Sequence, residues 1–89
     1  MARLLYTEQF VSDMAQIDLA SKREQVLDAC DRLASFPLMG TADMPLSLLR
    51  EYGRGIRKLV VRPFTVVYEY VEETDEVHVL GLVYGRAVR

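Results

Sequence analysis

The fold is decided by the stretch Phe64-Thr65-Val66-Val67-Tyr68-Glu69-Tyr70-Val71, a run of β-branched and aromatic residues that is typical of a β-strand. Before it, residues 56–62 are rich in Val and Leu, and Arg62-Pro63 separates the two runs. After it, Glu72-Glu73-Thr74-Asp75 forms a polar break suited to a hairpin loop, and residues 76–84 form a further strand. Three strands joined by short connections predict an antiparallel meander.

The sequence before the meander shows helical spacing. Apolar side chains fall at Phe10, Met14 and Ile17, which places them on one face of a helix expected over residues 8–17. Thr7 directly precedes this segment and is a suitable N-cap, because its hydroxyl can accept from a free backbone N–H of the first turn. We therefore expect one amphipathic helix here.

A second amphipathic helix follows after a short link. Ser21 and Glu24 match a capping box that would begin this helix, and Phe36-Pro37 should end it. Residues 3–6 form a brief apolar run that we expect to be a strand. The predicted class is α+β, with a short N-terminal strand and a two-helix hairpin packed on a three- to four-stranded, mainly antiparallel sheet.

Both faces of the predicted sheet are apolar. Strict alternation places four residues of the last strand on one side: His78, Leu80, Leu82 and Tyr84. The helices can cover one face, and the other needs either residues 37–55 or a separate partner. Within residues 37–55 the pattern leaves two alternatives open for Met44 to Tyr52, one helical turn or an extended edge. We expect an apolar hollow, edged by cations, that receives another macromolecule.

Composition limits the classes of protein. The chain has 89 residues, of which 51% are hydrophobic, so we expect one domain spanning residues 1–89. Its single cysteine, Cys30, cannot form an internal disulfide and suits a reducing cytoplasm. One His and one Cys are too few for a usual zinc site, and we expect no metal and no cofactor. The chain has no apolar run long enough for a membrane helix and no signal peptide at its start, so we expect a cytoplasmic protein without membrane contact.

Charge is concentrated in one segment. The formal net charge is −2, but residues 50–62 carry five basic side chains against Glu51 alone. The five are Arg50, Arg54, Arg57, Lys58 and Arg62. Such a stripe can bind phosphate or an acidic partner, and a solvated surface explains it equally well.

Two stretches carry a resemblance to a known family. Residues 55–70, with Gly55-Ile56-Arg57-Lys58-Leu59-Val60-Val61-Arg62 at their start, resemble the "R-x-L-V-x-x-Y-R-V-V-Y" strand pair of the bacterial RelE/ParE toxins. Residues 77–86 resemble the closing "V-x-H-G-R" of that family. The resemblance implies a toxin of a type II toxin-antitoxin module that a cognate antitoxin neutralises. A homodimer and a hetero-oligomer with the antitoxin are both compatible with it.

The family implies three alternatives for function. ParE-like members inhibit growth by binding DNA gyrase, whereas RelE-like members are endoribonucleases that cut mRNA on the ribosome. An inactive member would bind only its antitoxin. Here Thr65 occupies the position where RelE-like enzymes have an Arg, and no C-terminal helix carries a catalytic Tyr. These departures favour the ParE-like alternative over the enzyme.

Site residues follow from the same resemblance. Lys58 and Arg86 match basic catalytic positions of RelE-like enzymes, and Arg86 would lie at the scissile phosphate. Four more residues are candidates for binding the target or a phosphate: Arg57, Arg62, Tyr68 and Tyr84. Arg57 can alternatively be structural and pair with Glu69. His78 is the only side chain whose usual pKa suits acid–base chemistry near pH 7, but an ordinary strand position explains it more simply.

Overall fold

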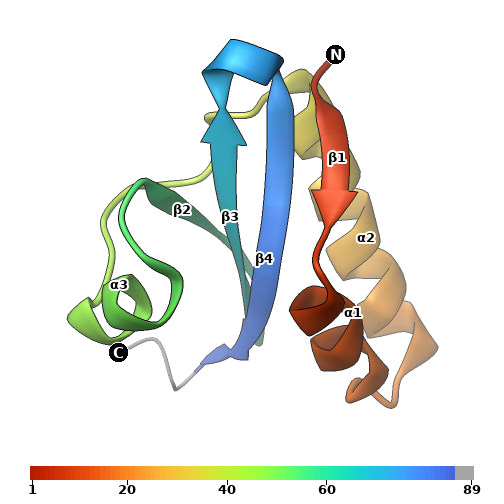
Figure 1. The fold of residues 1–89 in the computed structure, drawn as a ribbon. Helices are drawn as coiled ribbons and strands as arrows, with labels where there is room; N and C mark the ends of the chain where they lie inside the picture. Colours follow the sequence, from red (N-terminus) through yellow and green to blue (C-terminus); the bar gives the residue numbers. More distant parts are fainter. Residues whose placement is uncertain (86–89) are drawn as a thin grey trace.

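The computed structural model describes residues 1–85, which form a four-stranded mixed sheet with helices on both faces (Figure 1). The strands are β1 (Arg3–Tyr6), β2 (Ile56–Val61), β3 (Phe64–Val71) and β4 (Glu76–Tyr84), in the spatial order β1-β4-β3-β2. Strands β2, β3 and β4 form the predicted antiparallel meander, and β1 pairs in parallel with β4. The predicted α+β class is confirmed.

The helices divide between the two faces of the sheet. Helices α1 (Glu8–Ala15) and α2 (Ala20–Ser35) form the predicted hairpin on one face, and α3 (Leu46–Tyr52) lies on the other (Figure 1). A 3-10 turn, η1 (Glu72–Thr74), joins β3 to β4. Across residues 1–85, none of the helices is long and apolar enough to cross a membrane.

The two predicted helix starts have different outcomes. The Oγ1 of Thr7 accepts from the backbone N–H of Phe10 at 3.1 Å, which confirms Thr7 as the N-cap of α1. The capping box at Ser21 is wrong, because α2 begins at Ala20 with Leu19 as its N-cap and without a side-chain cap. The carbonyl of Leu19 accepts from the backbone N–H groups of Lys22 and Arg23 at 3.1 and 3.2 Å, so the first turn closes before Ser21 can cap it.

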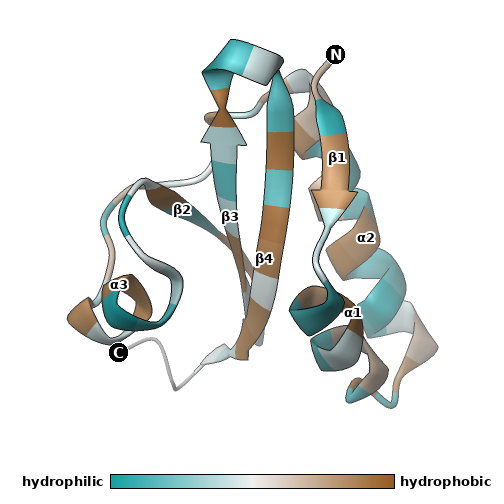
Figure 2. Ribbon diagram, in the orientation of Figure 1, coloured by the Kyte–Doolittle hydropathy of each residue, from teal (hydrophilic) through white to brown (hydrophobic). Residues whose placement is uncertain are grey.

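The larger apolar core lies between the helical hairpin and the sheet. Its members come from α1, α2, β3 and β4 and include Phe10, Val26, Leu33, Val66 and Val77. Polar and apolar residues alternate over Glu76–Val79, the first part of β4, as expected for a strand whose successive side chains point to opposite faces, and the rest of the strand is largely apolar (Figure 2).

A β-bulge in β4 breaks the predicted alternation. Val67 is opposite Gly81, but Tyr68 is opposite Val79, so Leu80 has no opposite residue. The predicted grouping of His78, Leu80, Leu82 and Tyr84 on one side is therefore wrong. Leu80 packs with the α3 side, whereas Leu82 joins the core beneath α1 and α2. The extra residue changes which face each later side chain meets.

The second face of the sheet is covered by the chain itself. Residues 46–52 form α3, which settles the alternative left open for this segment in favour of a helix. Leu48 is 2% exposed and packs on Ile56 and Val67. Gly81 permits this close approach, because a side chain there would collide with the ring and hydroxyl of Tyr52. The expected apolar hollow over this face is thus largely filled by α3.

Candidate functional site

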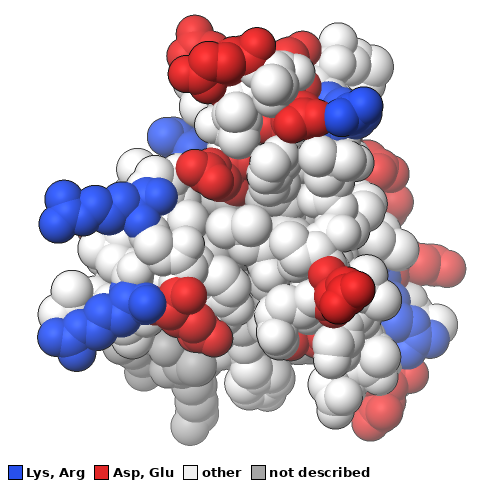
Figure 3. All heavy atoms as spheres, viewed as in Figure 1, with Lys and Arg blue, Asp and Glu red and all other residues white. Residues whose placement is uncertain are grey.

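The basic segment of the sequence covers the α3 and β2 side of the molecule. Arg50 is exposed on α3, Arg54 is exposed in the turn before β2, and Lys58 is half-buried on β2. Cationic side chains project from the side where α3 lies, while acidic side chains gather over η1 (Figure 3). These three members of the charge stripe therefore lie on the α3 side of the fold.

Lys58 lies on the α3 side of β2, opposite Val67 of β3. Its backbone N–H donates to the carbonyl of Thr41 at 2.8 Å, and its own carbonyl accepts from the N–H of Thr41 at 2.9 Å. This bridge fixes the connection between α2 and α3 along the outer edge of β2. The backbone of Lys58 is structural, and its side chain remains a candidate contact for a partner.

Arg57 points to the opposite face from Lys58, because neighbouring residues of a strand alternate. Its Nη2 donates to the carbonyls of Gly40 at 2.8 Å and Leu38 at 3.3 Å. The expected pairing with Glu69 is wrong, since the register places Glu69 opposite Ile56. The two adjacent cations of β2 therefore do not converge on one site.

Tyr68 is not available at the surface. Its side chain is fully buried in the larger core, and its hydroxyl accepts from the backbone N–H of Gly40 at 2.9 Å. A Cβ at Gly40 would lie 2.7 Å from this hydroxyl, so the glycine is needed for the contact. The structure thus gives Tyr68 a packing role in place of the expected contact with target or phosphate.

Two other candidates, Arg62 and Tyr84, lie toward the same end of the sheet. Arg62 is exposed in the turn between β2 and β3, and its carbonyl accepts from Lys22 Nζ at 3.5 Å. Tyr84 is 62% exposed and makes an edge-to-face contact with Phe64, its register partner, at 5.8 Å between ring centroids. Arg86 follows two residues later but lies outside the described residues. An exposed ring beside cations can stack on a partner or contact a phosphate.

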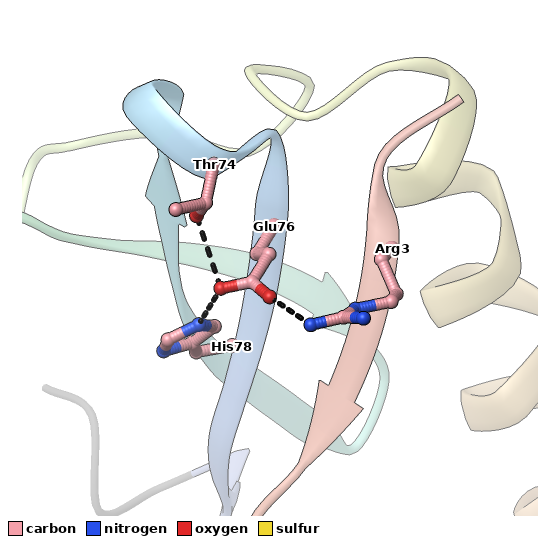
Figure 4. A network of polar contacts seen from close by, with 4 residues as sticks. All are labelled: Arg3, Thr74, Glu76 and His78. Carbon is pink, nitrogen blue, oxygen red and sulfur yellow. Dashed lines mark hydrogen bonds and ion pairs between the residues drawn. The ribbon is translucent and has the colours of Figure 1, made fainter.

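His78 belongs to a polar network at the other end of β4. Its Nε2 lies 3.1 Å from Glu76 Oε1, which also accepts from Thr74 Oγ1 at 3.0 Å, and Arg3 Nη2 donates to Glu76 Oε2 (Figure 4). These contacts lower the pKa of Glu76 to about 2, with His78 contributing most, then Arg3, then Thr74. The network connects β1 to β4, and His78, the one histidine of the sequence, contacts Glu76 within it.

The distance along β4 separates this network from the aromatic end. His78 and Tyr84 are six residues apart on the strand, a span of roughly 20 Å at the usual rise per residue. The acid–base candidate His78 and the exposed Tyr84 therefore cannot act on the same bond. The Glu76 network was missed from the sequence, although the spacing of Glu76 and His78 places both side chains on one strand face.

Thr65 occupies a buried position of β3. It is 3% exposed and lies opposite Val60 on β2 and Val83 on β4. This is the position at which the sequence resemblance leads one to expect an arginine. Among residues 1–85, no three His, Cys, Asp or Glu side chains are grouped so that they could hold a metal ion.

The strand, helical hairpin and meander give this molecule the fold of the RelE-like toxins. It superposes on the toxin of the intact Escherichia coli RelBE complex with a TM-score of 0.69 and 16% identity, over 94% of this chain and 96% of that one. The isolated E. coli RelE toxin gives a TM-score of 0.72 and 17% identity, over 94% and 84% of the two chains. The RelBE2 complex of Mycobacterium tuberculosis gives a TM-score of 0.76 and 14% identity, over 93% of this chain and 96% of that one. At such low identity these similarities establish the fold alone.

The family follows from the sequence of almost the whole chain. A model of the ParE toxin of type II toxin-antitoxin systems, parDE, matches residues 4–88. The chain therefore belongs to the ParE toxin family, within the RelE/ParE toxins. A search of the curated proteins found no significant match.

Proposed function

We propose that this ParE-family toxin inhibits growth by binding DNA gyrase, without making or breaking covalent bonds itself, and that a cognate antitoxin neutralises it. The observation that supports this reading most directly is the burial of Thr65, which is 3% exposed. A threonine enclosed between β2 and β4 supplies no positive charge to a scissile phosphate. Cleavage of RNA needs such charge together with a base and an acid.

The placement of the remaining polar groups supports the same proposal. Arg57 donates to backbone carbonyls on one face, Lys58 lies on the other, and His78 is engaged by Glu76. These groups do not surround a common point. The surface that we assign to the gyrase contact comprises the exposed Tyr84 and Arg62, and Arg86 follows Tyr84 by two residues in the sequence.

RelE-like cleavage of mRNA on the ribosome is the second candidate. One observation favours it: Tyr84 is exposed at the end of the strand that leads to Arg86, where a base could stack on its ring. In this mode Lys58 and Arg86 would act at the phosphate. In either mode the toxin would work in the cytoplasm, where its targets lie, and would form a hetero-oligomer with its antitoxin.

Two assays with the purified full chain separate these functions. If the proposal is right, the toxin inhibits the supercoiling of relaxed plasmid by gyrase and leaves mRNA on translating ribosomes intact. Addition of the antitoxin encoded beside the toxin gene restores supercoiling. Cut mRNA with normal supercoiling would replace the proposal by the RelE-like mode. Growth that continues normally after induction would leave only the inactive, antitoxin-binding alternative.

Substitution of Arg86 tests the proposed surface in cells. We expect Arg86→Ala to relieve growth arrest after induction, because it removes the cation nearest to Tyr84 in the sequence. The measurement is colony formation with matched toxin levels by immunoblot, and Arg32→Ala, an exposed arginine of α2, is the control. Full toxicity of the Arg86 variant would contradict this assignment.

A further inference from the structure

A small pocket lies at the start of β2, where the connection between α2 and α3 crosses the edge of the sheet. Its volume is about 260 Å³. Its walls are formed mainly by Leu38, Ala42, Leu49, Ile56, Arg57 and Tyr70. Pockets for drug-sized ligands usually exceed about 300 Å³, so this one has room for a single side chain of a partner and not for a cofactor.

Arg57 is the polar group of this pocket that remains incompletely satisfied. Tyr70 donates its hydroxyl to Asp75 Oδ1 at 2.7 Å, which leaves its ring as a wall. Arg57 is half-buried, and its Nη2 donates to two backbone carbonyls. Its Nε is shielded from solvent and has no acceptor. No carboxylate within residues 1–85 forms an ion pair with this guanidinium.

A half-buried cation without a counter-ion is unfavourable, because burial removes water without supplying a partner. A carboxylate is the group that best compensates a guanidinium, through charge-assisted hydrogen bonds. The surrounding walls are apolar, so the carboxylate should be carried by a residue with apolar neighbours. The exposed Arg50 and Arg54 nearby in the sequence would attract a segment of negative charge.

We propose that this pocket binds an acidic side chain, flanked by apolar residues, from a linear segment of the antitoxin. The inference rests on the proposed function, in which an antitoxin neutralises the chain. The pocket opens beside β2, which is an edge strand of the sheet. Thr41 already pairs with the outer edge of β2, so a thin peptide segment would lie across the mouth of the pocket and insert one side chain, whereas the broad surface of a folded target cannot enter so small an opening.

Peptide binding to the full chain tests the chemistry without involving gyrase. The probes are acetyl-Leu-Glu-Leu-amide and acetyl-Leu-Gln-Leu-amide, titrated into toxin labelled with 15N-arginine while the Nε–Hε resonances are recorded. We expect the glutamate peptide to shift the Arg57 resonance, assigned by its loss in Arg57→Lys. The glutamine peptide should bind about tenfold more weakly, since it lacks the charge-assisted hydrogen bond.

A pocket-filling variant keeps the test valid if changes at Arg57 disturb folding. Ala42→Phe enlarges an exposed side chain that lines the pocket, at a residue to which Arg57 makes no hydrogen bond. It should abolish the shift caused by the glutamate peptide. Ala15→Phe, an equal enlargement at an exposed alanine of α1, should retain it. Equal affinity for both peptides, or binding that persists in Ala42→Phe, overturns the proposal.

The antitoxin encoded beside the toxin gene provides the second measurement. Its affinity for the toxin should fall at least about tenfold in the Ala42→Phe variant, because the filled pocket no longer allows the charge-assisted contact. If Ala42→Phe weakens gyrase inhibition and leaves antitoxin affinity at the wild-type level, the pocket serves the target and the proposal is overturned. Absence of gyrase inhibition in the wild type, with both peptide results as expected, would instead refute only the proposed function.

Discussion

The thiol of Cys30 lies in the core beneath α2, with no exposed surface. Burial, reinforced by the neighbouring carboxylate of Asp31, raises the pKa of this thiol to about 12. The thiolate is the reactive form of cysteine, so a thiol with this pKa remains protonated and inert at neutral pH. The sequence predicts this burial, because Cys30 falls on the apolar row of a helix.

Thiol labelling tests the state of Cys30. In native protein at pH 8, a disulfide reagent such as DTNB should react at least about 100-fold more slowly than in denaturant, because reaction requires opening of the core. The control is Val11→Cys in a Cys30→Ala background, which places a thiol at a residue that is 60% exposed. Prompt labelling of native Cys30 would contradict the burial seen here.

Other single residues could not be assigned from the sequence. Tyr68 and Arg57 lie directly opposite each other on β3 and β2, and both are held by the connection between α2 and α3. Their partners are backbone groups of residues 38–40, more than fifteen positions away, in a segment without periodicity. A strand pattern identifies the face of a residue, but it does not show which loop passes over that face.

At the scale of elements, α3 determines what the second face of the sheet can do. Leu48 anchors this helix on Ile56 and Val67, and Tyr52 packs against Gly81. The helix has only seven residues, too few to be stable alone, so it depends on this packing. The sequence left two alternatives for covering this face, residues 37–55 or a separate partner, and a short helix from residues 37–55 covers it.

Truncation of the anchor should release α3. We expect Leu48→Ala to lower the free energy of unfolding by about 2–4 kcal/mol, because it leaves a cavity in a site that is 2% exposed. The matched control is Leu46→Ala on the same helix, where the side chain is 60% exposed and the cost should stay within about 0.5 kcal/mol. Urea unfolding measures the free energy of unfolding of both variants. An equal decrease in the two variants would show that Leu48 is not the anchor.

The contact between β1 and β4 depends on pH through Glu76. The carboxyl has an ordinary pKa of 4.5 and a folded value of about 2, because His78, Arg3 and Thr74 stabilise its charged form. A lowered folded pKa contributes stability above the unfolded value and loses it as the pH falls toward the folded value. This contribution is therefore present above about pH 4.5 and disappears toward pH 2.

A pH series with one substitution tests this linkage. Between pH 5 and pH 2 the urea midpoint of the wild type should fall more steeply than that of Glu76→Gln, which cannot titrate at this position. Glu73→Gln, at an exposed carboxylate of η1, controls for the loss of one charge. Parallel curves for the wild type and Glu76→Gln would show that the network does not contribute.

The bulge at Leu80 explains why the element pattern was only partly predictable. All three long strands were located from their apolar runs, and their antiparallel order followed from the short connections. Leu80, which interrupts the alternation, is apolar like its neighbours, so the sequence pattern does not reveal the bulge. The faces of Leu82 and Tyr84 were consequently assigned incorrectly.

At the scale of the whole molecule, two groups of exposed charge lie apart from one another, in addition to the charges of both signs on the helical hairpin. Exposed acidic residues lie at the η1 end (Glu72, Glu73 and Asp75), and exposed basic residues lie toward α3 and the start of β2 (Arg50 and Arg54) (Figure 3). Such a distribution orients an approaching charged partner more than it strengthens the final contact. The overall class and this charged segment could both be predicted from the sequence. The separation of Arg57, Lys58 and His78 could not, because it depends on the register of the strands.

Association kinetics with the antitoxin test this division. We expect Arg50→Gln together with Arg54→Gln to lower the association rate constant by roughly two- to fivefold at low salt, with little effect on dissociation. The difference should shrink as ionic strength rises. Glu72→Gln at the opposite end serves as the control. An association rate of the double variant that equals the wild type at low salt would show that these arginines do not steer the partner.

The parallel pairing of β1 with β4 imposes an order on folding. Residues 3–6 are synthesised well before residues 76–79, which are their register partners. The nascent chain must therefore keep β1 unpaired until residues 76–79 have been made, and this pairing is a contact between distant segments, which is intrinsically slow to form. A newly made copy consequently spends an interval in which β1 and the contact between Arg3 and Glu76 are missing from the sheet.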